Sequence, residues 1–207
     1  MRPLPPGDTQ LVQIVDAALA DASRRSGDFL LCRPGCAQCC IGVFALTELD
    51  ALRLQHGLIK LEESDPERAS RVRSRARDSA ARLSPDFPGD PQTGILFDDE
   101  SSLARFEDFG NDETCPVLDP ATGRCDLYSS RPLTCRAFGP PVQTGEALGH
   151  CELCFHGASE EQIAASEMQV DPDGLELKLL QELSETGVTP GRTIVTFALV
   201  TSPSPRR

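Results

Sequence analysis

The chain has 207 residues, of which 39% are hydrophobic, and a formal net charge of −12. This length and composition are enough to bury one sizeable core, so we expect a single domain over residues 1–200 and a disordered tail over 201–207. The acidic balance repels phosphate backbones and anionic headgroups, which excludes nucleic acid and membranes as expected partners.

The ends of the chain indicate where the protein works. Prolines and an aspartate stand near the start, where a secretory signal needs an unbroken apolar run. The apolar stretch at 193–200 is far shorter than the roughly 20 residues of a membrane span. We therefore expect a cytoplasmic protein. Thiols are kept reduced there and nine cysteines cannot all pair, so metal or redox chemistry is favoured over a disulfide framework.

Hydrophobic periodicity predicts a mainly helical chain. Thr47 and Asp50 form a helix-capping pattern, and Asp65 with Pro66 is typical of another helix start. The turn at 119–123 predicts a small β-hairpin over 115–128, and the Pro- and Gly-rich stretch 84–94 predicts a loop. The predicted helices cover 8–25, about 47–61, 66–83, near 130–138, 159–168 and 173–183.

Two segments allow alternative interpretations. Thr189 and Pro190 are typical of a helix start, whereas the β-branched run at 193–196 favours a strand. The arginines of 66–83 form either a solvated helix face, which is the favoured reading, or a surface for an acidic or phosphate-bearing partner. The fold class we expect is mainly α with irregular cysteine-rich metal-binding loops and a small β-hairpin.

Cysteine spacing gives the strongest indication of chemistry. Thiols two or three residues apart in a loop can converge on one metal ion, because Pro34 and Gly35 turn the chain back on itself. Soft sulfur ligands select zinc or iron–sulfur clusters over magnesium or calcium. The candidate ligands fall into three groups along the chain: Cys32, Cys36, Cys39 and Cys40; Cys115, Cys125 and Cys135; and Cys151 and Cys154.

Several questions about these thiols stay open at the level of sequence. Single cysteines can be small buried hydrophobes, and a catalytic cysteine would need a base, for which the candidates are His56, His150 and His156. The two later histidines flank the last cysteine pair and could add nitrogen ligands. Adjacent side chains such as Cys39 and Cys40 are expected to point in different directions. Nine thiols exceed one four-ligand site, which allows two sites or one site with unused thiols.

Two stretches together resemble the YkgJ-like cysteine-cluster family, which carries a CxxCxxCC-type motif and is described as zinc- or iron-chelating. The first is "CRPGCAQCC" at 32–40 and the second is "CPVLDPATGRCDLYSSRPLTCRAF" at 115–138. The resemblance covers about residues 32–154. It implies that the metal-binding set includes Cys36, Cys39, Cys40, Cys115, Cys125 and Cys135. Three residues separate Cys32 from Cys36, which departs from the motif.

The predicted function is metal binding by a cysteine-cluster region at about 30–157. An iron–sulfur cluster, most simply of the 4Fe–4S type, is favoured because a thiolate cluster is anionic and Arg131 and Arg136 flank Cys135 as cofactor-binding candidates. A protein redox partner is then expected. The alternatives are a zinc-binding interaction protein and an enzyme resembling flagellin lysine methylases, against which the lack of a recognisable S-adenosylmethionine-binding loop counts. No catalytic motif is recognised, and the sequence does not decide whether the protein is an enzyme.

Overall fold

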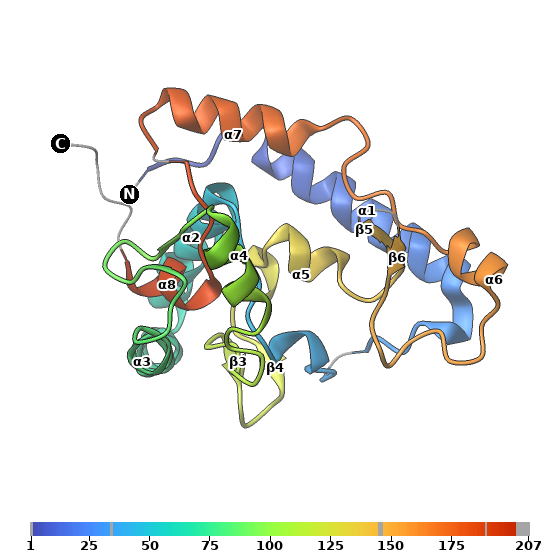
Figure 1. Ribbon diagram of the computed structural model, residues 1–207, viewed down its shortest axis with the longest axis horizontal. Coiled ribbons are helices and arrows are strands. Elements are labelled where there is room, and N and C mark those ends of the chain that lie inside the picture. Colours follow the sequence, from blue (N-terminus) through green and yellow to red (C-terminus); the bar gives the residue numbers. More distant parts are fainter. Residues whose placement is uncertain (1, 34, 145–146, 189, 202–207) are drawn as a thin grey trace.

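The computed structural model describes residues 2–33, 35–144, 147–188 and 190–201. Figure 1 shows the other helices arranged around a short central one, Leu133–Ala137. Within the described ranges the α-helices are α1 (Asp8–Ser26), α2 (Glu48–Ser64), α3 (Pro66–Leu83), α4 (Glu100–Glu107), α5 (Leu133–Ala137), α6 (Glu160–Ala165), α7 (Leu175–Glu185) and α8 (Val195–Val200). Short 3-10 turns lie at η1 (Gly27–Phe29), η2 (Gln38–Cys40) and η3 (Tyr128–Ser130).

The strands of the described residues form three separate two-stranded antiparallel hairpins. They pair β1 (Gly89–Asp90) with β2 (Ile95–Leu96), β3 (Leu118–Asp119) with β4 (Arg124–Cys125), and β5 (Val142–Thr144) with β6 (Ala147–Gly149). In the middle hairpin Leu118 is opposite Cys125. The prediction of a mainly helical fold with a small hairpin at 115–128 is confirmed.

Several predicted element boundaries need correction. Helix α4 and two of the hairpins were not predicted, because each is too short to show a hydrophobic period. The segment 193–200 is mostly helix: Val195 begins α8, and the strand interpretation of its β-branched residues is wrong. Tertiary contact decides this, since α8 packs against both α2 and α3 and buries Phe197 and Leu199. Thr189 lies outside the described residues.

The buried apolar side chains gather in layers between the helices. One cluster joins α2, α3 and α8 to the β3–β4 hairpin, and Cys115 and Cys125 pack against it. A second joins α1, α5 and α7 to α2. Helix α5 therefore lies between the two helix groups, as Figure 1 shows. None of the helices in the described ranges combines the length and the apolar character that a bilayer crossing requires.

A buried charge cluster connects α1, α2 and α5. Arg53 donates to Asp8 at 2.6 Å and to Asp50, and all three side chains are almost fully buried. Asp50 also accepts a hydrogen bond from the backbone N–H of Leu133 at 3.0 Å, which satisfies a free donor at the start of α5. Burial raises the pKa of Asp50, with Arg53 acting against that rise. This cluster fixes α5 against the first two helices.

Replacing Arg53 with Ala should unfold the protein more easily, because two buried carboxylates lose their cation. We expect the free energy of unfolding to fall by about 3–5 kcal/mol, as for other buried pairs that lose one partner. Urea denaturation followed by circular dichroism measures this. Arg24→Ala, which removes an exposed pair with Asp21, is the control and should leave the midpoint unchanged. Equal effects of the two variants would contradict the role assigned to the cluster.

Candidate metal centre

The two cysteine motifs are joined by backbone pairing. The N–H of Cys115 donates to the carbonyl of Cys40 at 2.8 Å, and the N–H of Gly42 donates to the carbonyl of Glu113 at 2.9 Å. Between them Ile41 and Thr114 form an antiparallel bridge. The sequence places these segments far apart, with α2, α3 and α4 between them. The motifs at 32–40 and 115–135 therefore lie together, as the resemblance implies.

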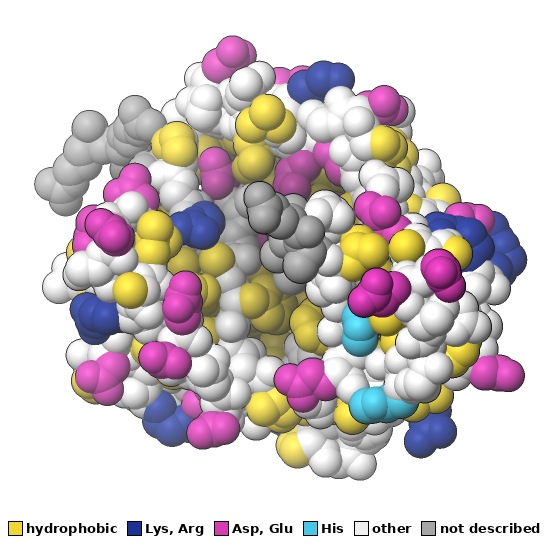
Figure 2. Space-filling view, turned by 45° about the vertical axis from the view of Figure 1, so that its right-hand side comes forward, with side chains coloured by type: hydrophobic (Ala, Val, Ile, Leu, Met, Phe, Trp, Pro, Cys, Tyr) yellow, Lys and Arg dark blue, Asp and Glu magenta, His cyan; other side chains and the backbone are white. Residues whose placement is uncertain are grey.

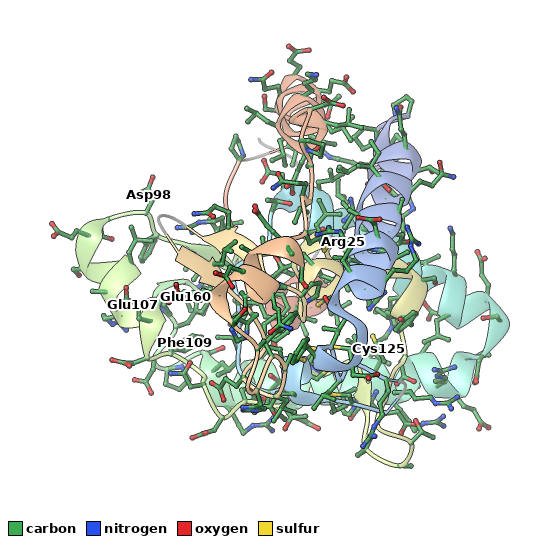
Figure 3. All side chains as sticks on the ribbon, turned by 90° about the vertical axis from the view of Figure 1, so that its right-hand side faces the viewer. Arg25, Asp98, Glu107, Phe109, Cys125 and Glu160 are labelled. Carbon is green, nitrogen blue, oxygen red and sulfur yellow. The ribbon has the colours of Figure 1, made fainter. Side chains whose placement is uncertain are left out.

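Five thiols meet at this junction, and we call them the five-cysteine group. Cys39 and Cys40 come from η2, Cys115 from the bridge, Cys125 from β4 and Cys135 from α5. Electrostatic interactions connect Cys39 to Cys115, Cys125 and Cys135. All five side chains are partly exposed rather than buried or fully open. Figure 3 shows Cys125 beside the blue segment that carries the first motif, on the opposite side of the view from Asp98.

The adjacent pair in η2 does not diverge as expected. Cys39 and Cys40 are hydrogen-bonded to each other, and both interact with Cys115 and Cys125. The tight 3-10 turn rotates successive side chains by less than a strand does, so both thiols face the same group. The hydrogen bond with Cys40 and the charge of Arg131 lower the pKa of Cys39 to about 6. This shift favours the thiolate of Cys39, the form that binds metals.

The other thiols of the group favour their protonated forms. Burial, reinforced by neighbouring thiols, raises the pKa of Cys115 to about 12 and also raises the pKa of Cys135. Burial raises the pKa of Cys125, with Arg131 opposing the rise. A bound cation would reverse these shifts and release protons, because thiolates are the ligand form.

Asp126 anchors the β3–β4 hairpin to α3. Its buried carboxylate accepts from Arg68 and from Arg75, and its N–H donates to Val117 O at 2.7 Å. Arg75 also donates to the carbonyl of Pro116 at 2.8 Å. These contacts hold the residues on either side of Cys125. Nothing in the local sequence marks Asp126, and it was not among the predicted site residues.

The arginine-rich face of α3 is exposed at Arg71, Arg77 and Arg82, as expected for a solvated face, but several arginines of this helix also pair with carboxylates. Arg68 and Arg75 pair with Asp126, and Arg82 pairs with Glu113 at 2.6 Å, next to the bridge between the motifs. The other named arginine contact, Arg73 with Glu62, is an exposed pair within the helical layer. The basic helix therefore braces the segment that carries Cys115 and Cys125.

The remaining thiols form a second assembly, the four-cysteine group: Cys32, Cys36, Cys151 and Cys154. Cys154 lies within hydrogen-bonding contact of both Cys32 and Cys151, and Cys36 interacts electrostatically with the same two residues. Burial and these neighbouring thiols raise the pKa of Cys32 to about 12. Cys151 and Cys154 are buried, whereas Cys32 and Cys36 are exposed.

Backbone contacts hold the loop of Cys151 and Cys154 in a tight turn. The N–H of Cys151 donates to Gly139 O at 3.2 Å, and the N–H of Cys154 donates to Cys151 O at 2.9 Å. Gly139 has a φ of 127°, and a Cβ there would lie 2.7 Å from the sulfur of Cys32. Only glycine fits this position, because both the backbone angle and the approach of the thiol exclude a side chain. Phe155 stacks on Phe29 and closes the turn from the apolar side.

The histidines lie at the edge of this group. His150 contacts the carbonyl of Cys151 through Nδ1 at 3.1 Å, and its ring packs against Phe155. His156 is exposed. His56, in the middle of α2, contacts the carbonyl of Arg2 through Nε2. The structure assigns neither His150 nor His156 to the thiols as a nitrogen ligand.

The two candidate arginines differ in their surroundings. The positive charge of Arg131 lowers the pKa of both Cys39 and Cys125. Its guanidinium also lies over the ring of Tyr128, 3.7 Å from the ring centroid. Arg136 is buried and donates to both carboxylate oxygens of Asp16, at 2.7 and 2.8 Å. Arg136 therefore ties α5 to α1, which corrects its expected place beside a cofactor.

The donor set fits a metal that prefers sulfur. All nine cysteines are free thiols, and within the described residues no group of three or more His, Cys, Asp or Glu side chains is already arranged to hold a metal ion. The thiols are gathered by the backbone and face one another in two groups. The thiols would have to come closer together to form a closed ligand shell, as is common where metal binding completes folding.

Comparison with known families agrees with this donor set. Residues 31–155 match the model of the family CxxCxxCC, described as a "Putative zinc- or iron-chelating domain". The match covers more than half of the chain, which therefore belongs to this family. It is a metal-binding cysteine-cluster protein. No curated protein and no solved structure matches the chain.

Loss of the Asp126 anchor should weaken metal binding without removing a thiol. Asp126→Ala frees Arg68 and Arg75 and loosens the hairpin around Cys125, so we expect the affinity of the five-cysteine group for its metal to fall by about tenfold, as when outer supports of ligands are removed. Competition with a chromogenic chelator measures the affinity. The control is Glu62→Ala, which removes the carboxylate that pairs with Arg73, another arginine of α3. This variant should bind the metal with unchanged affinity. An Asp126→Ala protein with unaltered affinity would contradict the anchoring role.

Proposed function

We propose that the five-cysteine group binds a 4Fe–4S cluster and that the protein supports the redox chemistry of a partner protein in the cytoplasm. The observation that carries this proposal is the proximity of five thiols from four segments, with Arg131 as the nearby cation. A cubane cluster takes four cysteine ligands, so one thiol of the group is surplus. When bound, the cluster would supply one-electron chemistry. This chain's residues hold it and set the surrounding charge.

Exposed hydrophobic side chains in the cysteine segments favour docking of a partner protein. Among the described residues, large hydrophobic side chains that are exposed concentrate in the cysteine segments. They include Ile41 at 48%, Tyr128 at 62% and Phe138 at 43% exposure. Arg131 adds a cation beside Tyr128. Apolar and aromatic groups mixed with arginine are enriched in protein interfaces, so a partner would dock where an electron could leave the cluster.

A second candidate concerns the four-cysteine group, which we propose as a separate zinc site. Cys32 and Cys36 have three residues between them, and Cys151 and Cys154 have two. Two such pairs from two loops are typical of structural zinc. The metal would hold the loop after α1 to the loop after β6. A zinc protein with only interaction functions is the alternative if both groups take zinc.

The metals can be identified by anaerobic purification. We expect brown protein that absorbs near about 400 nm and contains iron and acid-labile sulfide in equal amounts, as a cubane cluster requires. Cys135→Ser should lose the iron and the colour, since this thiol comes from α5 and interacts with Cys39, Cys115 and Cys125. Colourless protein with stoichiometric zinc alone would overturn the cluster proposal.

The zinc proposal is tested separately in the same preparations. Cys154→Ser should remove zinc measured by mass spectrometry while the iron content and the visible spectrum are kept, because Cys154 contacts only thiols of the four-cysteine group. Cys135→Ser should show the opposite pattern. Parallel loss of both metals in both variants would show that the groups are not separate sites.

A further inference from the structure

Arg136 of α5 joins helix α1 to the turn that carries Arg131. It is 3% exposed, and arginines are rarely buried this deeply unless every donor has a partner. Beside its two bonds to Asp16, it donates from Nη2 to the carbonyl of Ser129 at 2.6 Å and from Nε to the carbonyl of Arg131 at 3.1 Å. All three nitrogens of one guanidinium are therefore used, and two of them hold η3 and the residue that follows it.

A close backbone approach fixes the same turn from the side of α2. A Cβ placed on Gly57 would lie 2.4 Å from both Cβ and Oγ of Ser130. Because glycine has no Cβ, η3 can pack against α2 at a distance that a larger residue at this position would prevent. The turn is thus held on two sides, by α2 and by Arg136.

The side chain of Arg131 is in turn held against this fixed turn. Its Nε donates to the carbonyl of Tyr128 at 3.0 Å, and its guanidinium stacks on the ring of the same residue. A hydrogen bond and a cation–π contact together restrict both the position and the plane of the guanidinium. The positive charge therefore stays in one place relative to Cys39 and Cys125, the two thiols on which it acts.

A fixed cation matters at this position because the charge of the protein as a whole is negative. The formal net charge is −12, and Figure 2 shows acidic side chains spread over the face that it views, with fewer basic ones between them. A negative surrounding disfavours the addition of an electron to a centre that is already anionic. A cation close to the thiols opposes this effect, and net charge is one of the factors that set the potential of iron–sulfur centres.

We propose that Arg136, anchored by Asp16, positions Arg131 beside the five-cysteine group, and that the charge of Arg131 raises the reduction potential of the cluster bound there. This inference rests on the proposed function, because it takes the group to hold a 4Fe–4S cluster. One-electron reduction adds one negative charge and neither forms nor breaks a bond, so the fixed cation stabilises the reduced state more than the oxidised one. Arg136 is a positioning residue that acts on the centre through Arg131.

A redox titration of the anaerobically purified full chain tests the first step. Dithionite is the electron donor, and visible absorbance gives the reduction potential. Arg131→Gln should lower the potential by about 59 mV, which corresponds to a tenfold change in the ratio of reduced to oxidised centre for one electron. The control is Arg73→Gln, which removes an exposed cation of α3 and should leave the potential unchanged. Equal potentials in Arg131→Gln and the unaltered protein overturn the inference.

A double-mutant cycle tests whether Arg136 acts through Arg131. Arg136→Lys keeps the positive charge, but lysine lacks the planar fork that serves a carboxylate and two carbonyls at once. This variant should lower the potential by less than Arg131→Gln does, because the guanidinium of Arg131 is loosened rather than removed. In a chain that already carries Arg131→Gln, it should have no further effect. The same drop in both backgrounds overturns the positioning role.

Asp16→Ala examines the same support at a half-exposed side chain, and it replaces Arg136→Lys if that variant does not fold. Removal of a carboxylate raises the potential by its charge alone, whereas release of Arg136 and Arg131 lowers it. We expect the potential to fall, and a rise contradicts the positioning role. Colourless protein overturns the proposed function and this inference together. A brown protein whose potential is the same in all three variants overturns this inference alone.

Discussion

The backbone pairing between Cys40 and Cys115 is the interaction on which the metal-binding region depends. It consists of amide and carbonyl groups, so it forms with or without metal and places two distant motifs in register. Two other contacts position the segments that carry Cys125 and Cys135 next to this pairing. Asp126 holds the hairpin of Cys125 to the arginines of α3, and Asp50 holds the start of α5, which carries Cys135. Removing any one support leaves the others in place, and each positions a different thiol.

Both of these supports use buried carboxylates rather than apolar contacts. Ion pairs of this kind gain little net stability over a hydrophobic replacement, because desolvation offsets the attraction. What they supply is direction: a carboxylate that accepts from Arg53 and from the N–H of Leu133 fixes an angle between helices, which an apolar face leaves free to slide. Ligand thiols must meet within a few tenths of an ångström, so the directional contacts lie where the ligands are held.

The sequence predicted the parts that local rules control. Capping at Thr47 and Asp65 and the turn at 119–123 were correct because each depends on neighbouring residues. The helix in segment 193–200 was not predictable in this way, since packing of α8 against α2 and α3 overrides the β-branched preference of residues 193–196. Helix α4 was missed because it is too short to show a hydrophobic period. Cysteine spacing predicted that the thiols are metal ligands. It did not predict their division into two groups, or that Cys39 and Cys40 both face the same group. Nor could it separate Arg131 from Arg136, whose partner Asp16 is 120 residues away.

The division of the thiols makes the first motif a link between the two groups. Cys36 belongs to one group and Cys39 to the other, with Ala37 and Gln38 between them. A segment this short cannot move at one end without moving at the other, since two residues span less than about 11 Å even when extended. The four-cysteine group ties that segment to the loop after β6, while the backbone bridge ties it to Cys115. Ordering of the loop at Cys151 and Cys154 therefore reduces the conformational freedom of Cys39. The conformational entropy of this segment is lost once, when a metal binds to the first of the two groups, and is not lost again when a metal binds to the other.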